Sequence, residues 1–329
     1  MQSDNLSIPA NTLAADIRRK KITIMTPCYN EEGGIHECHL AVRLLFQESL
    51  PEYDYEHIFI DNCSTDNTLA ALREIAAGDG NVKVIVNSRN FGPNHSPYHA
   101  ILESSGDAVV PVVADLQTPV ATIRDFVRLW EAGTDMVMGI RVGMSEAWWL
   151  RASRNLYYKI MSRLSHLEHF HGFIGFGLFD RRVVEAMRRL QDPNPYFRGI
   201  ISEIGFKKAF VEYVQPPRKH GRSHLSVLDL LDYAILGMVS CSKVPLRIMT
   251  VTGLFVSMLS LFLGFAFFLL KIVFWDSFPM GIAPILIGTF FLGSVQILCL
   301  GVLGEYVGVV FDYVRNRPLV IERERINFD

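Results

Sequence analysis

An uninterrupted apolar run near the C-terminal end constrains this chain more than any other feature. Residues 248–270 contain no charged side chain over 23 positions, and at about 1.5 Å per residue such a helix crosses a hydrocarbon layer of about 30 Å. A second uncharged run covers residues 277–304, in which Pro279 and Pro284 suit an entry loop and residues 285–303 suit a second span. The sequence therefore predicts a hairpin of two transmembrane helices, with two buried helices of a soluble protein as the alternative.

Basic side chains flank the predicted hairpin at both of its outer ends. Lys243 and Arg247 precede or begin the first span, and Arg315 and Arg317 follow the second. Because lysine and arginine concentrate in cytoplasmic segments, both outer ends are predicted to lie in the cytoplasm. The first twenty residues contain no apolar run of signal-peptide length, so the part of the chain before the hairpin is expected on the same side.

Composition limits the other classes of function. Half of the 329 residues are hydrophobic and 20% are charged, which is too apolar for a disordered chain, and a domain length of roughly 150 residues suggests two units. The formal net charge of −2 excludes the global basic field of a protein that binds nucleic acid. Five scattered cysteines without a CxxC pair argue against a disulfide framework and against a zinc site.

Short β-rich runs alternate with helical patterns through the N-terminal two thirds of the chain. The predicted strands cover residues 22–26, 57–60, 82–86, 108–113 and 136–140, and predicted helices cover residues 35–46 and 68–76. This alternation predicts a parallel α/β sheet. Ligands of such sheets bind beyond the carboxyl ends of the strands, so the residues there are candidates for a site.

The predicted elements divide the chain into five parts. They are an N-terminal extension (1–20), a cytoplasmic α/β domain (21–223), an amphipathic juxtamembrane helix (224–246), the transmembrane hairpin (247–311) and a cytoplasmic C-terminal tail (312–329). Apolar residues recur at helical spacing in the juxtamembrane segment. We expect this helix either to lie flat on the cytoplasmic leaflet or to pack against the α/β domain.

Polar residues follow three of the predicted strands, at positions 26–32, 61–66 and 114–117. Carboxylate and carboxamide groups that converge at one sheet edge suit a divalent metal bound mainly through the phosphates of a substrate. Ser64 and Asp66 also suit the start of the next helix and are expected to cap it. A functional role is expected of Asp61 and Asp115, because each ends an apolar strand.

Nine short motifs follow one another along nearly the whole chain. They are PCYNEE (27–32), IDNCSTDNT (60–68), RNFG (89–92), GDAVV (106–110), ADLQTP (114–119), GIR (139–141), GFGLFDRRVV (175–184), RKHGRS (218–223) and KVPLR (243–247). In this order, and followed by two membrane helices, they resemble the family 2 glycosyltransferases. Within that family the chain is similar to the polyisoprenyl-phosphate glycosyltransferases related to dolichyl-phosphate mannose synthase.

The resemblance implies a Rossmann-like, nucleotide-diphosphosugar-binding domain of the type called GT-A as the catalytic domain. The residues that it implies for binding the nucleotide sugar are Pro27, Tyr29, Glu31, Asp61 and Asp115, and those for ligating Mg²⁺ or Mn²⁺ at the diphosphate are Asp115 and Gln117. Two positions depart from the family pattern. Val113 replaces the first of two aspartates in the metal motif, and Asn62 replaces a second aspartate but retains an acceptor for the nucleoside.

Arginines supply the positive charge that a departing diphosphate requires. With Asp115, the resemblance implies Arg141, Arg218 and Arg222 as catalytic residues, and it implies Arg141, Arg154, Arg218, Arg222 and Ser223 as ligands of a lipid phosphate. Planar guanidinium groups match phosphate oxygens in pairs. The alternative for the basic segment 218–223 is a juxtamembrane patch attracted to anionic lipid.

The expected activity is therefore transfer of a hexose-type sugar, with inversion, from a nucleotide diphosphate sugar to polyprenyl (undecaprenyl) phosphate. A UDP-sugar is the default donor, and the product would serve cell-envelope glycosylation at a bacterial inner membrane. Residues 172–178 contain no carboxylate, which favours a phosphate nucleophile over a hydroxyl that needs a base. The resemblance is also compatible with a homotetramer and a flippase partner.

Two other functions are the alternatives to this activity. One is a family 2 glycosyltransferase whose acceptor is a sugar or lipid hydroxyl, and the other is a catalytically silent membrane protein that binds nucleotide sugars. Val113 in the metal motif is the main argument for the silent protein. Gly253, Gly264, Gly288 and Gly293 are expected to permit close contacts between membrane helices, within or between subunits.

Overall fold

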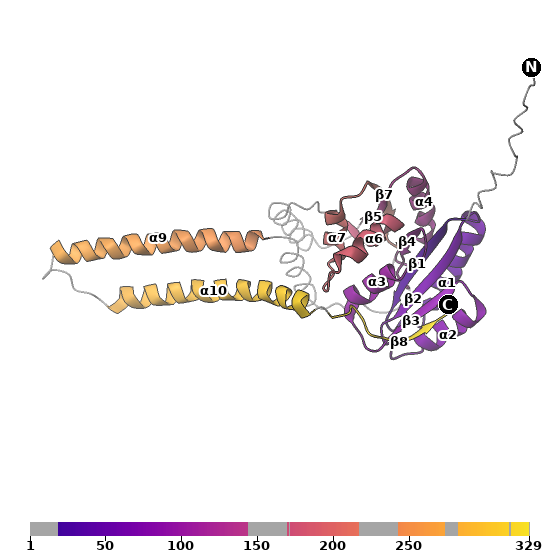
Figure 1. The fold of residues 1–329 in the computed structure, drawn as a ribbon, viewed down its shortest axis with the longest axis horizontal. Coiled ribbons are helices and arrows are strands. Elements are labelled where there is room, and N and C mark those ends of the chain that lie inside the picture. Colours follow the sequence, from indigo (N-terminus) through magenta and orange to yellow (C-terminus); the bar gives the residue numbers. More distant parts are fainter. Residues whose placement is uncertain are drawn as a thin grey trace, which may run out of the picture.

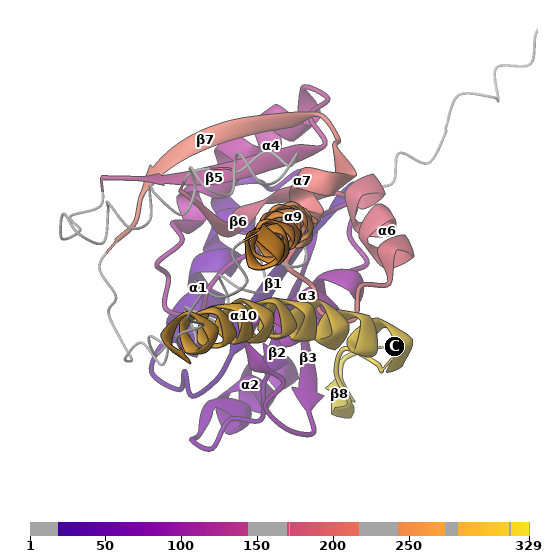
Figure 2. The same ribbon diagram turned by 90° about the vertical axis from the view of Figure 1, so that its left-hand side faces the viewer.

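The computed structural model describes residues 19–143, 170, 172–216, 243–273, 282–315 and 317–328. A globular α/β part contains one sheet with helices on both faces, and two long helices extend together from one side of it (Figure 1). Viewed along these two helices, the sheet and its covering helices lie behind them (Figure 2). The predicted extension and most of the predicted juxtamembrane helix lie outside the described residues.

The sheet has eight strands in the order β7-β5-β6-β4-β1-β2-β3-β8. Their bounds are β1 Lys21–Cys28, β2 Asp54–Asp61, β3 Val82–Asn87, β4 Ala108–Pro111, β5 Met136–Val142, β6 Phe173–Asp180, β7 Lys208–Val214 and β8 Glu322–Ile326. All five predicted strands are present and run in the same direction, as predicted, but the sheet as a whole is mixed. β6 runs antiparallel to β4 and β5, and β8 runs antiparallel to β3. Neither of the antiparallel strands, β6 and β8, was predicted from the sequence.

Helices cover both faces of the sheet. α1 (Ile35–Leu44), α2 (Thr68–Gly78) and α4 (Ile123–Glu131) bury apolar residues in one core, and α3 (Gly92–Leu102), α6 (Arg181–Leu190) and α7 (Phe197–Ile204) do so in the other. A single π-helical turn, Leu45–Ser49, extends α1, and a short 3-10 turn, Val120–Thr122, precedes α4. On β2, Phe59 faces the first core while Ile58 and Ile60 face the second, as the two-residue period of a strand requires.

The junction between β6 and α6 has a structural role. The Asp180 side chain accepts hydrogen bonds from the Arg182 backbone N–H at 2.9 Å and from Trp130 Nε1 at 2.7 Å. An aspartate in this position caps the exposed N–H groups at a helix start. Because Asp180 pairs with Ala108 at the beginning of β4, this junction lies at the amino edge of the sheet.

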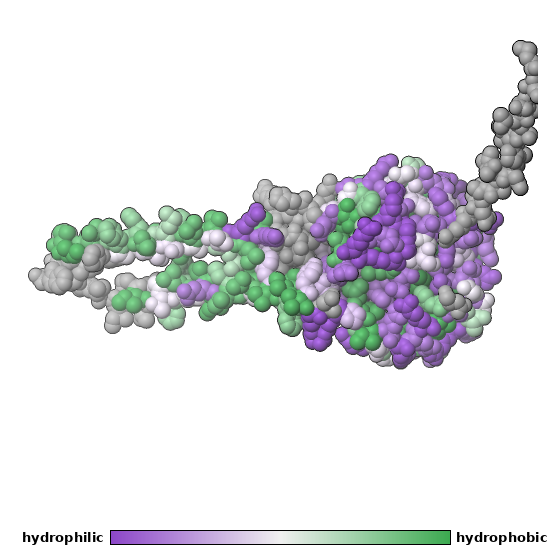
Figure 3. Space-filling view, in the orientation of Figure 1, coloured by the Kyte–Doolittle hydropathy of each residue, from purple (hydrophilic) through white to green (hydrophobic). Residues whose placement is uncertain are grey.

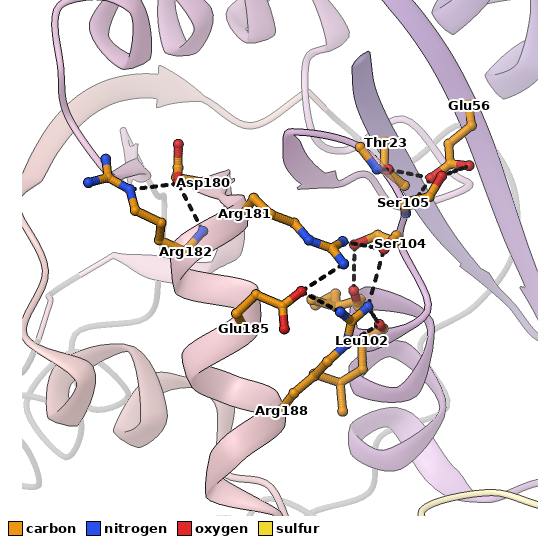
Figure 4. Close-up of polar contacts among 12 residues, drawn as sticks. Thr23, Glu56, Leu102, Ser104, Ser105, Asp180, Arg181, Arg182, Glu185 and Arg188 are labelled. Atoms are coloured by element: carbon orange, nitrogen blue, oxygen red, sulfur yellow. Dashed lines mark hydrogen bonds and ion pairs between the residues drawn. The ribbon is translucent and has the colours of Figure 1, made fainter. Parts of the chain in front are cut away.

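Arginines of α6 bind the C-terminal end of α3 (Figure 4). Arg188 donates to the carbonyl oxygens of Leu102 and Ser104, Arg181 donates to the Ser104 carbonyl at 2.5 Å, and Glu185 pairs with both arginines. Carbonyl groups at a helix end lack partners within the helix and attract cations. Part of the GFGLFDRRVV motif therefore joins α6 to the end of α3. This contact lies near the amino end of β4 and not at the carboxyl edge of the sheet.

Two helices are long and apolar enough to cross a membrane. α9 (Val244–Val273) contains the span Val244–Ala266 with a mean hydropathy of 2.0, and α10 (Ile282–Arg315) contains the span Gly288–Arg315 with a mean hydropathy of 1.8. Their apolar side chains are exposed along the pair, whereas the globular α/β part beside them shows a mostly polar surface (Figure 3). Both predicted spans are therefore helical.

The expectation about Pro284 is wrong, and the expectation about the glycines does not hold within this chain, while contacts between subunits stay a prediction. Pro284 lies in the first turn of α10 and not in an entry loop, and proline is tolerated there because its missing N–H has no partner within the helix. A Cβ atom built on Gly253, Gly264, Gly288 or Gly293 meets nothing within 4 Å. Within the described part of the chain these glycines therefore do not bring α9 and α10 into close contact.

The C-terminal segment returns to the sheet as β8, which was predicted only as part of a tail. Glu322 at the start of β8 pairs with Asn87 at the carboxyl end of β3. Because α10 ends at Arg315, only a few residues before β8, the C-terminal end of α10 lies near the carboxyl edge of the sheet. Two ion pairs, Arg73–Glu324 at 2.6 Å and Glu103–Arg325 at 2.8 Å, and a hydrogen bond between His99 Nε2 and Glu322 at 2.5 Å hold β8 in place.

Candidate active site

The carboxyl ends of four strands bring the predicted site residues to one edge of the sheet. Cys28 of β1 pairs with Asp61 of β2, and β4 runs parallel to β1 with Met25 opposite Pro111. β5 has the same direction as β4, because both are antiparallel to β6. The loops after β1, β2 and β4 and the end of β5 therefore meet at this edge.

Hydrogen bonds connect the loop after β1 to the loop after β2. The Asn30 backbone N–H donates to Ser64 Oγ at 3.0 Å, Asn30 Oδ1 accepts from the Thr65 N–H at 2.8 Å, and the Glu31 N–H donates to Thr68 Oγ1 at 2.9 Å. Asn30 has φ 56°, a left-handed conformation that asparagine tolerates better than most residues. These hydrogen bonds fix the backbone from which Tyr29 and Glu31 project.

Of the two predicted helix caps, one is confirmed. Asp66 Oδ1 accepts from the Thr68 N–H at 3.0 Å, at the start of α2. Ser64 does not cap the helix, because its hydroxyl accepts from the Asn30 N–H of the neighbouring loop. A contact between loops that are 34 residues apart leaves no pattern in the local sequence.

Asp61 is a buried carboxylate at the end of β2. Its side chain is 0% exposed, and both oxygens accept from the Ser64 N–H at 3.3 Å. Burial raises the pKa of Asp61, and the bonds from Ser64 and the charge of Arg323 on β8 oppose that rise. A buried acceptor in this position can bind hydroxyl or N–H donors of a ligand. Pro27, Tyr29 and Glu31 are half-buried beside it on β1 and the following loop.

The expected role of Asn62 as an acceptor for a nucleoside does not fit the structure. Its Oδ1 accepts from Asn87 Nδ2 at 3.0 Å and from the Phe91 N–H at 2.9 Å. Its Nδ2 donates to Asn90 Oδ1 at 2.8 Å and to the Gly92 carbonyl at 3.2 Å. Asn62 thus has both acceptors and donors occupied, and it organises the RNFG loop before α3.

Asp115 lies in a tight turn after β4. It is 7% exposed, its Oδ1 accepts from the Gln117 N–H at 3.1 Å, and Leu116 between them has φ 55°. The turn is pressed against the start of α1, because a Cβ atom on Gly34 would lie 3.0 Å from the Ala114 carbonyl oxygen. A larger residue at position 34 would require the turn to shift slightly, so glycine suits this close approach of the Asp115 turn to the N-terminal end of a helix.

The donor set suits a divalent metal only with help from a substrate. Within the part of the chain that the structure describes, no group of three or more histidine, cysteine, aspartate or glutamate residues could hold an ion. Asp115 and Gln117 offer carboxylate and carboxamide oxygens, whereas Val113 offers a 36% exposed apolar side chain. Mg²⁺ is often bound by one or two protein carboxylates and completed by phosphate oxygens and water. The residues present fit that mode of binding.

Arg141 is the predicted arginine that the structure places at the site edge. Its backbone N–H donates to the Gly172 carbonyl at 3.0 Å, and its Nη1 donates to Gln215 Oε1 at 2.6 Å. These contacts hold the guanidinium group at the end of β5, where it can face an anionic ligand. The other predicted phosphate ligands, Arg154, Arg218, Arg222 and Ser223, lie outside the described residues.

Comparison with known proteins gives consistent matches. The model of the family described as Glycosyl transferase family 2 matches residues 23–188. The SfII prophage-derived bactoprenol glucosyl transferase of Shigella flexneri is 35% identical over 302 residues, which cover 92% of this chain and 97% of the relative. The bactoprenol glucosyl transferase of Shigella phage SfV is 34% identical over 307 residues, or 93% of this chain and 99% of the relative.

Among solved structures, glucosyl-3-phosphoglycerate synthase from Mycobacterium tuberculosis in complex with Mn²⁺ and UDP-glucose matches 67% of this chain and 77% of its own. The identity is 19% and the TM-score is 0.43. A likeness at this level carries no information about the ligands of the present chain.

Proposed function

Because the chain belongs to glycosyl transferase family 2, we propose that it transfers a sugar from a nucleotide diphosphate sugar to the phosphate of a polyprenyl lipid. Family membership makes the chain a glycosyltransferase, and the mixed sheet with helices on both faces is the GT-A fold of that family. The predicted family and fold are therefore confirmed. The length and apolar composition of the helix pair support the proposal that the chain is associated with a membrane.

The position of the site relative to the helix pair carries the proposal of a lipid acceptor. Asp61, Asp115 and Arg141 lie at the carboxyl edge of the sheet, and β8 brings the C-terminal end of α10 to the same edge. A polyprenyl tail is insoluble in water, so an enzyme that uses its phosphate must hold the site close to the bilayer. Bactoprenol, which the names of the relatives specify, is a lipid of this kind.

The donor is proposed to be a UDP-sugar bound across the ends of β1, β2 and β4. Buried Asp61 would accept hydrogen bonds from the nucleoside, with Pro27, Tyr29 and Glu31 beside it. Asp115 and Gln117 would hold Mg²⁺ or Mn²⁺ with the diphosphate. The metal, when bound, neutralises charge that develops on the departing diphosphate.

The acceptor phosphate would attack the anomeric carbon as the bond to the diphosphate breaks, and the configuration inverts. A phosphate monoester has a second pKa near 6 and is mostly dianionic at neutral pH, so this nucleophile needs no general base. Arg141 would position a phosphate group through paired hydrogen bonds. The proposal includes Arg154, Arg218, Arg222 and Ser223 as further phosphate ligands, from the sequence pattern alone.

The proposed setting is the cytoplasmic face of a bacterial inner membrane. Basic residues adjoin the outer ends of the helix pair, Lys243 and Arg247 at α9 and Arg315 and Arg317 at α10, as expected for cytoplasmic ends. The lipid-linked sugar would then supply envelope glycosylation on the other side, which requires a flippase. A homotetramer is proposed from the resemblance only.

The test is a transfer assay with purified full-length protein, undecaprenyl phosphate and a panel of labelled nucleotide sugars, with Mg²⁺, Mn²⁺ or a chelator. Metal-dependent label in the lipid extract from one donor is expected. Asp115→Asn should lower kcat by about a hundredfold or more, since charge stabilisation at a leaving group has this magnitude. Asp125→Asn, which alters an exposed residue on α4 paired with Arg128 at 3.6 Å, should retain the normal rate. Equal rates for Asp115→Asn and the parent would contradict the role of Asp115.

A further inference from the structure

Two buried hydrogen-bond donors lie on neighbouring strands at the carboxyl edge. Arg141 on β5 and Tyr213 on β7 are direct partners in the parallel register of these strands. Arg141 Nε and the Tyr213 hydroxyl are buried, and neither has a hydrogen-bond partner among the described residues. Buried donors without partners are rare and costly in proteins, so this pair needs an explanation.

Both side chains are held in place by other contacts. Arg141 Nη1 is bonded to Gln215 Oε1 at 2.6 Å, which fixes the plane of the guanidinium group. The ring of Tyr213 packs edge-on against Phe176, with centroids 5.3 Å apart and an interplanar angle of 80°. Burial raises the pKa of Tyr213, against a smaller opposite effect of Arg141, so the hydroxyl keeps its proton and remains a donor.

The donor pair lies on the face of the sheet that carries the Asp115 turn. Leu116, in the middle of that turn, packs against the core cluster that contains Tyr213 and Phe176. α4, which follows the turn, contacts β5, β6 and β7. Arg141 and Tyr213 are thus on the same side of the sheet and at the same edge as the proposed metal and diphosphate site.

We infer that Arg141 Nε and the Tyr213 hydroxyl together bind one anionic oxygen of a substrate phosphate group. An anion is the matching acceptor because one donor carries a full positive charge and the other is neutral. Both atoms are buried, and hydrogen bonds to a charged oxygen are stronger away from bulk water. The inference rests on the proposed function and adds Tyr213, which no sequence motif identified, as a phosphate-binding residue.

The phosphate could belong to the acceptor lipid or to the donor diphosphate, and two binding measurements distinguish these sources. Full-length protein and its Tyr213→Phe variant would be compared in lipid nanodiscs. The affinity for UDP would be measured by calorimetry, and the affinity for undecaprenyl phosphate by the ligand-induced rise in Tm. Tyr55→Phe is the matched control, because its hydroxyl contacts Asp79 and Tyr55 pairs with Ile22 at the amino end of β1.

Tyr213→Phe should weaken the binding of one of the two ligands by about tenfold to a hundredfold, the effect of a hydrogen bond to a charged group. Its Tm without ligand should equal or exceed that of the parent, because the substitution removes an unsatisfied buried hydroxyl. Tyr55→Phe should leave both affinities unchanged. Loss confined to UDP would assign the pair to the diphosphate, and loss confined to the lipid would assign it to the acceptor.

Unchanged affinity for both ligands would overturn the inference, whether or not Tm falls. A fall in Tm with intact binding would show that the hydroxyl has a purely structural role. The binding measurements do not depend on turnover. A parent protein that binds both ligands but transfers no sugar would therefore contradict the proposed function. The effect of Tyr213→Phe on ligand binding would still test this inference.

Discussion

At the scale of single residues, the site separates side chains that can meet a ligand from side chains that build the loops around it. Asp61 and Asp115 are buried acceptors at strand ends, and the sequence predicted both from their position after apolar strands. Asn62 and Ser64 stand in the same motif but are used within the protein. The sequence could not distinguish them, because their partners come from other loops.

Asn62 offers a direct test of this separation. In Asn62→Asp, a carboxylate oxygen would face Asn90 Oδ1 and the Gly92 carbonyl, which now accept from Nδ2 at 2.8 and 3.2 Å. Two donated bonds would be replaced by contacts between acceptors, so we expect the free energy of unfolding to fall by about 1–3 kcal/mol. Thermal unfolding of the detergent-solubilised protein would measure the change.

Gln47→Glu is the control for Asn62→Asp, since it makes the same chemical change at an exposed position and should leave Tm nearly unchanged. A variant Asn62→Asp as stable as the parent at neutral pH would show that the amide donors of Asn62 contribute little to the loop.

At the scale of helices and strands, hydrophobic periodicity and composition predicted the elements that depend on local sequence alone. The five predicted strands and the two apolar helices are present, because their apolar patterns are continuous in the sequence. β8 was missed because its sequence, ERERI, is largely charged and reads as a solvated tail. It becomes a strand through pairing with β3, an ion pair to α2 and a hydrogen bond to α3, none of which is adjacent in sequence.

Glu56 links four elements at the amino edge of the sheet. This side chain is 2% exposed and accepts from Thr23 on β1 at 2.6 Å, from Lys83 on β3 at 2.9 Å and from Ser105 before β4 at 2.7 Å. Figure 4 shows its contacts with Thr23 and Ser105. Burial alone would raise the pKa of Glu56, but these hydrogen bonds outweigh it and lower the pKa from 4.5 to about 2.

A depressed pKa in the folded protein predicts the direction of a pH effect. The stability that Glu56 contributes is fully present above pH 4.5, the ordinary value, and is lost as pH falls toward 2. By linkage the full loss is about 3 kcal/mol. Thermal unfolding between pH 6 and 3 would measure the larger part of this loss: Glu56→Gln should be less stable near neutral pH and should lose less stability on acidification than the parent.

Glu74→Gln provides the comparison for this pH effect, because Glu74 is exposed on α2. Its stability should follow pH as that of the parent does. If Glu56→Gln and the parent lost stability in parallel, Glu56 would not be a source of the acid sensitivity.

At the scale of the whole molecule, the order of elements explains how the polar candidate site comes to lie near the ends of the two apolar helices, α9 and α10. α9 and α10 lie side by side, and the N-terminal end of α9 and the C-terminal end of α10 both face the globular α/β part (Figure 1). β8 then returns the chain to the sheet, where it forms the edge strand and pairs with the carboxyl end of β3. The carboxyl edge with the candidate site, the end of α10 and the candidate phosphate ligand Arg141 thus lie toward the same side, which suits an acceptor whose phosphate projects from a bilayer.

The acceptor group is tested most directly by comparing undecaprenyl phosphate with undecaprenol in the same detergent, with one labelled nucleotide sugar and purified full-length protein. Label should enter the lipid extract only when the phosphate is present, and mild acid should release it, because a sugar linked through a phosphodiester at its anomeric carbon is acid-labile. Label transferred equally to undecaprenol, in an acid-stable linkage, would contradict a phosphate acceptor and favour a hydroxyl acceptor.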